Sequence, residues 1–201
     1  MLSSVYQPPK GNSWYPNAQN LAEGSISICI FAFNNSHIMA QLPVLVIKFG
    51  TASITHPNGE PDESVVASIA VQVAALKERY RVVLVSSGAV GAGKSAIRDY
   101  KGTLNERKAA AAVGNPILLQ IYARFFETHG IRIAHFFARH GIRIAQSLCE
   151  RHHFANRRQF LQLKETYQEL WNNGIIPIAN ENDVVSNLEL KFSDNDELAT
   201  L

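Results

Sequence analysis

Three segments of the chain place polar or glycine residues directly after an apolar run that is typical of a buried strand. Lys48 and Gly50 follow the first run, Ser87 and Gly88 follow the second, and the polar segment 180–185 follows the third. The carboxyl ends of parallel strands gather at one edge of an α/β sheet, so we expect these residues to share a ligand site. A lysine that closes a buried strand needs an anion, and the amides of a glycine-rich turn accept a carboxylate or phosphate.

The glycine-rich segment also matches a second pattern. Residues 88–95, GAVGAGKS, satisfy the P-loop consensus GxxxxGK[ST], in which backbone amides and a lysine, here Lys94, hold phosphates. However, Gly102 interrupts the helix that should follow. Asp183, the nearest candidate for a magnesium-binding aspartate, lies too far past its strand. We therefore favour a glycine turn between a strand and a helix, and keep a P-loop NTPase as an alternative.

The third cluster combines Asn180 and Asp183 with a second polar run, in which Asp194, Asn195 and Asp196 follow one another. Side chains of these types can bind an amino group or magnesium, and they can equally order turns by capping their own backbone. From the residues alone, both interpretations stay open.

Hydrophobic periodicity predicts the elements that must position these residues. Apolar runs predict strands, and apolar positions at helical spacing predict the helices between them. The strands are expected at 44–49, 81–87 and 175–180, and the helices at 65–76, 106–113, 117–126 and 156–173. We expect Gly114 and Pro116 to separate the second and third helices, and Asn156 with Gln159 to form a capping box at the start of the fourth. This alternation predicts an α/β protein with a parallel sheet covered on both faces.

Other segments depart from an ordinary domain. Residues 125–135 recur almost unchanged as residues 136–146, and only one copy can supply the expected strand GIRIAQSL. We expect residues 1–38 to form an unstructured extension before the folded unit of residues 39–201. Met39 offers a second start, so one hypothesis is that the extension is not native, and the alternative is a native unstructured arm. The final helix begins only a few residues before Leu201, so we expect the domain to be truncated at this end.

Composition excludes several classes of protein. Hydrophobic residues make up 46% of the 201 positions and charged residues 18%, which predicts a globular protein rather than a disordered one. The net charge of +2 and the lack of a long apolar run predict no nucleic-acid or membrane partner. Cys29 and Cys149 lack CxxC spacing, and the adjacent His152 and His153 lack a carboxylate pair, so we expect no metal site.

Five blocks of sequence carry a family resemblance. In chain order they are VIKFGTASIT, RVVLVSSGAVGAG, KAAAAVGNPILL, GIIPIANENDVVS and ELKFSDNDELA. Together they resemble the glutamate 5-kinases of the amino acid kinase family, over about residues 44–201. The resemblance implies a three-layer α/β/α sandwich with a mostly parallel sheet, truncated at the C-terminus. It also implies that the P-loop string is a coincidence, because this family does not use a P-loop.

The resemblance implies ATP-dependent phosphorylation of the side-chain carboxylate of L-glutamate, the first step of proline biosynthesis, with ATP and Mg²⁺ as cofactors. By position it assigns catalytic roles to Lys48 and Asp196, and ATP binding to Lys48 and Gly50. Asp196 would hold Lys48 or the metal in place, and no residue is assigned as a metal ligand. Asp183 would pair with the ammonium group of glutamate, and Ser87 with its carboxylates. The residues assigned to glutamate are Ser87, Gly88, Asn180, Asp183, Asp194 and Asn195.

The resemblance also bears on what this chain can do. The family's adenine and ribose site and its second catalytic lysine correspond to sequence beyond Leu201, so we expect the chain to be weakly active or inactive. The alternatives are an inactive remnant or a glutamate-binding fragment, another amino acid kinase, or a P-loop NTPase. The family further implies a cytoplasmic protein that forms a homo-oligomer in its full-length form.

Overall fold

The computed structural model describes residues 28–33, 42–128, 145–185 and 195–200. Its centre is a five-stranded sheet in the order β1-β2-β3-β5-β4. The strands are β1 (Ile28–Phe33), β2 (Val44–Phe49), β3 (Arg81–Ser86), β4 (Ala145–Cys149) and β5 (Pro177–Glu181). Strands β2, β3, β5 and β4 run parallel, and β1 pairs with β2 in the antiparallel direction at one edge. The predicted α/β class with a mostly parallel sheet is confirmed.

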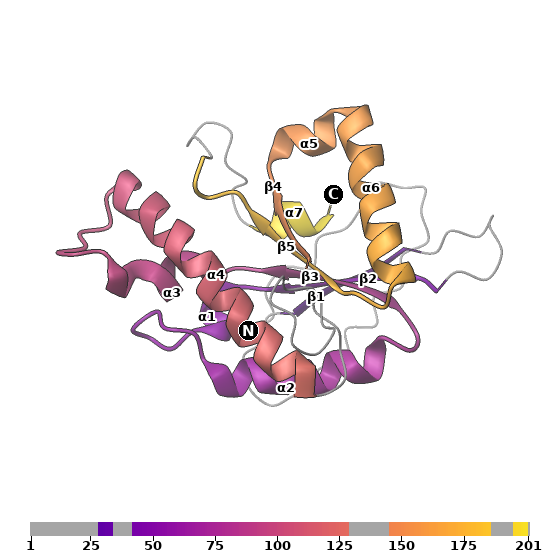
Figure 1. Ribbon diagram of the computed structural model, residues 1–201, viewed down its shortest axis with the longest axis horizontal. Helices are drawn as coiled ribbons and strands as arrows, with labels where there is room; N and C mark the ends of the chain where they lie inside the picture. The colour runs from indigo at the N-terminus through magenta and orange to yellow at the C-terminus, as the bar shows by residue number, and fades with distance from the viewer. Residues whose placement is uncertain (1–27, 34–41, 129–144, 186–194, 201) are drawn as a thin grey trace, which may run out of the picture.

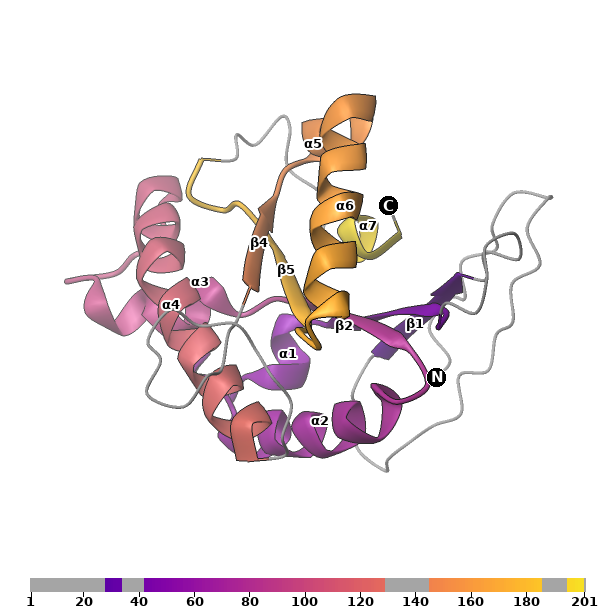
Figure 2. The same cartoon turned by 45° about the vertical axis from the view of Figure 1, so that its right-hand side comes forward.

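Helices cover both faces of this sheet, as Figures 1 and 2 show: α2 and α4 lie on one side, and α5, α6 and α7 on the other. The helices are α1 (Thr51–Ile54), α2 (Glu63–Leu76), α3 (Ala89–Gly93), α4 (Leu104–Thr128), α5 (Arg151–Ala155), α6 (Arg157–Asn172) and α7 (Asn195–Thr200), and a short 3₁₀ helix spans Lys94–Ala96.

Two hydrophobic cores separate the three layers, because successive side chains of a strand point to opposite faces. Ile47 and Leu84 pack in the core beneath α2 and α4, together with Tyr122. Val83 and Val85 pack in the core on the other face, beside side chains of α6 and α7. This arrangement is the expected α/β/α sandwich.

The α6 helix begins as the sequence indicates. The Asn156 side chain accepts hydrogen bonds from the backbone amides of Arg158 and Gln159 and so caps the helix. The predicted capping box is only half formed, because the amide of Asn156 donates to the carbonyl of His152 and not to the Gln159 side chain. This backbone hydrogen bond closes the last turn of α5, and it takes the place of the second hydrogen bond of the capping box.

One helix replaces the two that were expected at 106–113 and 117–126. Helix α4 is continuous through Gly114 and Pro116. Pro116 lacks the amide that would bond one turn back, but the buried face of α4, which includes Leu118 and Tyr122, continues across it. Tertiary packing therefore outweighs the local signals for a break.

The structure corrects the expectation for residues 1–38 and describes only part of the repeated segment. Strand β1 lies within residues 1–38, which were expected to be unstructured, and its pairing with β2 provides the backbone hydrogen bonds that order it. The second copy of the repeated segment supplies Ala145 and Gln146 at the start of β4, and the first copy begins inside α4. Residues 129–144, which hold the rest of the two copies, lie outside the described residues.

Candidate functional site

The parallel strands bring the predicted site segments to one edge of the sheet. Phe49 of β2 is paired in register with Ser86 of β3, and Cys149 of β4 with Glu181 of β5. The four strands therefore end side by side, and the loops that leave them share one edge, where ligands of open α/β sheets bind.

A cavity of about 480 Å³ lies at this edge. Its walls come from the start of α1, the turn from β3 into α3, α3 itself, the loop before α4, the end of β5 with the loop that follows it, and from α4 and α7. The lining residues are Thr51, Ser87, Gly88, Ala89, Val90, Gly91, Tyr100, Gly102, Arg107, Asn180, Glu181, Asp183 and Asn195. Five residues predicted from the sequence are among them: Ser87, Gly88, Asn180, Asp183 and Asn195.

Gly88 lets the chain turn from β3 into α3 at the cavity wall. Its φ of +99° lies in the left-handed region that disfavours other residues, and an added Cβ would lie 3.3 Å from Ile54 Cδ1. Gly91 is equally constrained, because a Cβ there would lie 2.2 Å from the carbonyl oxygen of Gly59. Since these glycines have no side chains, the cavity is lined here by peptide backbone, which an anionic ligand can approach closely.

Asn195 connects the end of β3 with the end of β5. Its side-chain amide donates to Ser87 Oγ at 2.7 Å, to the Ser86 carbonyl at 3.1 Å and to Asn180 Oδ1 at 3.1 Å. Because the Ser87 oxygen accepts this bond, its own hydrogen remains to be donated toward the cavity. Ser86 is held from the opposite face of the sheet by Tyr122, whose hydroxyl lies 3.0 Å from Ser86 Oγ.

Asn180 extends this network to α4. Its amide nitrogen donates to Asn115 Oδ1 at 3.0 Å, and its oxygen accepts from the backbone amide of Glu181 at 2.9 Å. Gln146 of β4 donates to the same Asn115 oxygen at 3.3 Å. These connected amides thus join α4 and α7 to the strands β3, β5 and β4.

Lys48 lies beside the cavity and not in its wall. The side chain is buried, with 6% of its surface exposed, and its ammonium group would lie 3.6 Å from a Cβ added to Gly50. Neither Lys48 nor Gly50 lines the cavity, whereas the next residue, Thr51, does. The structure therefore brings Lys48 to the predicted sheet edge but not into the lining of the cavity.

Two predicted residues cannot be placed in the same way. Asp194 lies outside the described residues, and Asp196 is described only by its backbone position in α7. Their predicted roles stay predictions.

The cavity also contains side chains that the sequence did not single out. Arg107 from α4 faces it with a positive charge, and Glu181 joins Asp183 with a negative one. Glu181 is buried, with 6% of its surface exposed. Glu181 adjoins Asn180 in the polar cluster, so the cluster itself was the available signal. Arg107 sits in a charged helical turn, where nothing distinguishes it from a solvent-exposed residue.

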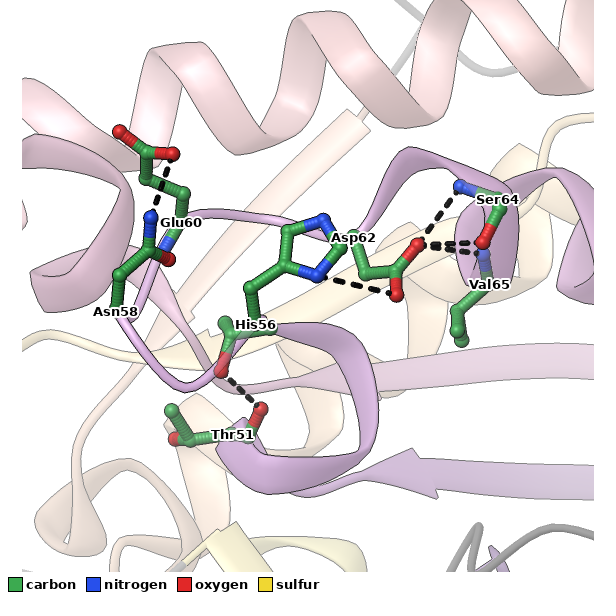
Figure 3. A network of polar contacts seen from close by, with 8 residues as sticks. Thr51, His56, Asn58, Glu60, Asp62, Ser64 and Val65 are labelled. Atoms are coloured by element: carbon green, nitrogen blue, oxygen red, sulfur yellow. Dashed lines mark hydrogen bonds and ion pairs between the residues drawn. The ribbon is translucent and has the colours of Figure 1, made fainter.

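Lys94, the lysine of the P-loop pattern, points away from this cavity. Its ammonium group donates to the carbonyl of Asn58, in the turn after α1, and it does not line the cavity. Figure 3 shows this turn, in which Asn58 and Glu60 contact each other and His56 contacts Asp62. Residues 89–93 form helix α3, and the amide of Ala92 bonds the Gly88 carbonyl. A P-loop needs such amides free for phosphate, so this geometry does not favour one.

The paired histidines form part of a helix start. Glu150 caps α5: its backbone amide donates to His153 Nδ1 at 2.9 Å, and one of its carboxylate oxygens lies 3.4 Å from His152 Nδ1. Burial lowers the pKa of His153, and the adjacent His152 lowers it further.

Within the described ranges, no group of three or more His, Cys, Asp or Glu side chains is placed to hold a metal ion. No helix in this part of the chain is long and apolar enough to cross a bilayer.

The fold and the cavity together define an α/β/α protein with a polar cavity at the carboxyl ends of its parallel strands. The model of the amino acid kinase family matches residues 43–201, and the chain belongs to that family.

Curated relatives carry the name glutamate 5-kinase. The relative from Cyanothece sp. (strain PCC 7425 / ATCC 29141) is 41% identical over 161 residues, which cover 78% of this chain and 41% of the relative. The relative from Trichlorobacter lovleyi is 37% identical over 167 residues, which cover 82% of this chain and 42% of the relative. This chain therefore spans about two fifths of the length of the curated relatives that it matches.

Proposed function

We propose that this chain binds L-glutamate in the cavity and forms the glutamate-binding part of an ATP-dependent glutamate 5-kinase. The reaction would phosphorylate the side-chain carboxylate of glutamate, the first step of proline biosynthesis. The observation that carries the proposal is the cavity itself. Five residues assigned to glutamate by resemblance, from positions 87 to 195, line one hollow whose wall holds both a guanidinium and two carboxylates.

The charges of the cavity suit an amino acid with a second acidic group. Asp183 and Glu181 offer negative charge for an ammonium group, and Arg107 offers a planar pair of donors for a carboxylate. The Ser87 hydroxyl, which already accepts from Asn195, has a proton to donate to a carboxylate oxygen. A ligand with one ammonium and two carboxylates satisfies all of these groups at once.

Lys48 is proposed to act on the phosphoryl group and not on glutamate. Gly50 has no side chain, so a phosphate oxygen can approach the buried ammonium group. Phosphoryl transfer depends mainly on alignment and on positive charge near the transferred group. A unit charge pair at 4 Å contributes about 4 kcal/mol at an effective dielectric of 20. Asp196 is proposed to orient Lys48, and Asp194 to contact glutamate.

ATP is proposed as a substrate that brings Mg²⁺ with it. No described residue is assigned to the metal. A cytoplasmic location and a homo-oligomer are proposed from the family alone.

Two measurements test this proposal. Isothermal titration calorimetry of the purified chain should show L-glutamate binding, and D-glutamate should bind more weakly because the charged groups of the cavity are fixed in space. ADP formation should require L-glutamate and should fall about 100- to 1,000-fold in Lys48→Ala. Lys94→Ala serves as the matched control and should retain activity.

The second candidate is glutamate binding without turnover, which the position of Lys48 outside the lining of the cavity favours. Glutamate binding without ADP formation would support this candidate. ADP formation that survives Lys48→Ala and is lost in Lys94→Ala would instead support a P-loop enzyme. Absence of glutamate binding would overturn the proposed function.

A further inference from the structure

Asn115 is a buried polar residue on the otherwise apolar inner side of α4. Only 5% of its surface is exposed, and it does not line the cavity. Its oxygen accepts from Asn180 at 3.0 Å and from Gln146 at 3.3 Å, so one carbonyl joins α4 to β5 and β4. Its own amide nitrogen has no hydrogen-bond partner among the residues that the structure describes. The carbonyl is therefore the part of this side chain that the network uses.

Hydrogen bonds to two backbone groups fix how the side-chain amides of Asn180 and Asn195 are oriented. The backbone amide of Glu181 can only donate, so the Asn180 side chain must turn its oxygen toward that amide. The carbonyl of Ser86 can only accept, so it holds Asn195 with its nitrogen toward β3. Asn180 must then turn its nitrogen toward α4, where an acceptor is required.

Asn115 supplies that acceptor, and its effect reaches the cavity through two further hydrogen bonds. Asn180 accepts from Asn195 at 3.1 Å, and Asn195 donates to the Ser87 hydroxyl at 2.7 Å. Without the carbonyl of Asn115, the Asn180 nitrogen would be buried and unpaired, which favours rotation of its side chain. Rotation would remove the acceptor that Asn195 uses.

We propose that Asn115 is a positioning residue for the glutamate site: its carbonyl holds Asn180 and Asn195 so that the Ser87 hydroxyl donates into the cavity. The proposal rests on the proposed function for its ligand. Its structural part, the orientation of the two amides, does not depend on any ligand.

The test compares three variants of the full chain. Asn115→Leu keeps the size of the side chain and removes the acceptor. Asn115→Asp keeps an acceptor oxygen and replaces the nitrogen, which has no partner among the described residues, by a second carboxyl oxygen. Leu118→Ala, at a buried position one turn further along α4, is the control for lost stability without a change in the network.

Calorimetry should show L-glutamate binding about 10- to 100-fold weaker in Asn115→Leu, substantial recovery in Asn115→Asp, and little change in Leu118→Ala. NMR of the asparagine side-chain amides, recorded without ligand, should show that Asn180 and Asn195 lose hydrogen-exchange protection in Asn115→Leu alone. Unchanged protection and unchanged affinity in a folded Asn115→Leu would overturn the proposal, and so would an equal loss of affinity in Leu118→Ala. If wild type does not bind glutamate, the proposed function fails, and the NMR comparison still decides the role of Asn115.

Discussion

Asn195 donates its side-chain amide to the Ser87 hydroxyl at 2.7 Å, although the two residues lie 108 positions apart in the chain. This contact joins the start of α7 to the residue that follows β3, and both residues line the cavity. It also sets the chemistry of the serine, because a hydroxyl that accepts from an amide is free to donate its own proton. The site can therefore be tested at Ser87 without disturbing the core.

Ser87→Ala should weaken L-glutamate binding about 10- to 100-fold, because hydrogen bonds to charged groups contribute about 1.5–3 kcal/mol. Calorimetry measures the affinity, and circular dichroism checks that the fold is retained. Ser95→Ala, at an exposed position that does not line the cavity, is the matched control and should bind like wild type. Equal affinities of Ser87→Ala and wild type would show that the hydroxyl does not contact the ligand.

Much of the cavity could be predicted because its residues follow buried strands. An apolar run such as 44–49 identifies a strand from its pattern alone, and parallel pairing then brings the residues after each strand to one edge. This reasoning predicts that Ser87, Gly88 and Asp183 lie at that edge, where all three line the cavity. It could not place Arg107, because the contribution of α4 to the cavity depends on how the helix packs against α3.

The same limit explains the error at α4. Gly114 and Pro116 look like a break in the sequence, but Gly114 is where α3 and α4 approach most closely. A Cβ on Gly114 would lie 1.7 Å from the carbonyl oxygen of Ala89. The glycine thus allows two helices to touch and does not end one of them, which no local pattern distinguishes. Lys48 is a second example. Its position in the strand predicts the sheet edge at which it lies, but does not predict whether its side chain lines the cavity.

Gly114→Ala should destabilise the fold by at least about 2 kcal/mol, because the new methyl group overlaps backbone atoms that cannot rotate away. Urea unfolding measures the change. Ala109→Gly, at an exposed position of the same helix, should lower stability by only about 1 kcal/mol through helix propensity. A Gly114→Ala protein as stable as wild type would contradict the close contact of α3 and α4.

Asp62 links the turn of Figure 3 to α2. Its carboxylate accepts from the Ser64 hydroxyl at 2.6 Å and from the backbone amides of Ser64 and Val65. Asp62→Ala should therefore lower the free energy of unfolding by about 1 kcal/mol, a typical value for loss of an N-cap.

The pH dependence of this contribution follows from the same contacts. The hydrogen bond from the Ser64 side chain lowers the pKa of Asp62 below its ordinary value of 3.8. The contribution is thus present above about pH 4 and disappears as the pH falls through the lowered pKa. Asp62→Asn keeps a capping oxygen without the charge, so its stability should fall less than that of wild type between pH 5 and pH 2. Parallel pH profiles of the two proteins would contradict this account.

Tyr122 should make the protein sensitive to alkaline pH. The side chain is completely buried against the sheet, and this burial raises its pKa to about 12. In the unfolded chain a tyrosine ionises near pH 10, so stability present below pH 10 is lost as the pH rises toward 12. Between pH 8 and pH 11 this linkage lowers the free energy of unfolding by about 1.4 kcal/mol.

Tyr122→Phe removes both the ionisation and the hydrogen bond to Ser86. At pH 8 the variant should be about 1 kcal/mol less stable than wild type, because one buried hydrogen bond is lost. At pH 11 the two proteins should be nearly equal, since only wild type has lost the alkaline contribution of Tyr122. Leu118→Ala destabilises the same core without removing an ionisable group, so its difference from wild type should stay constant between the two pH values. A constant difference for Tyr122→Phe as well would mean that Tyr122 ionises in the folded protein as readily as in the unfolded chain, which its complete burial against Ser86 and the sheet does not allow.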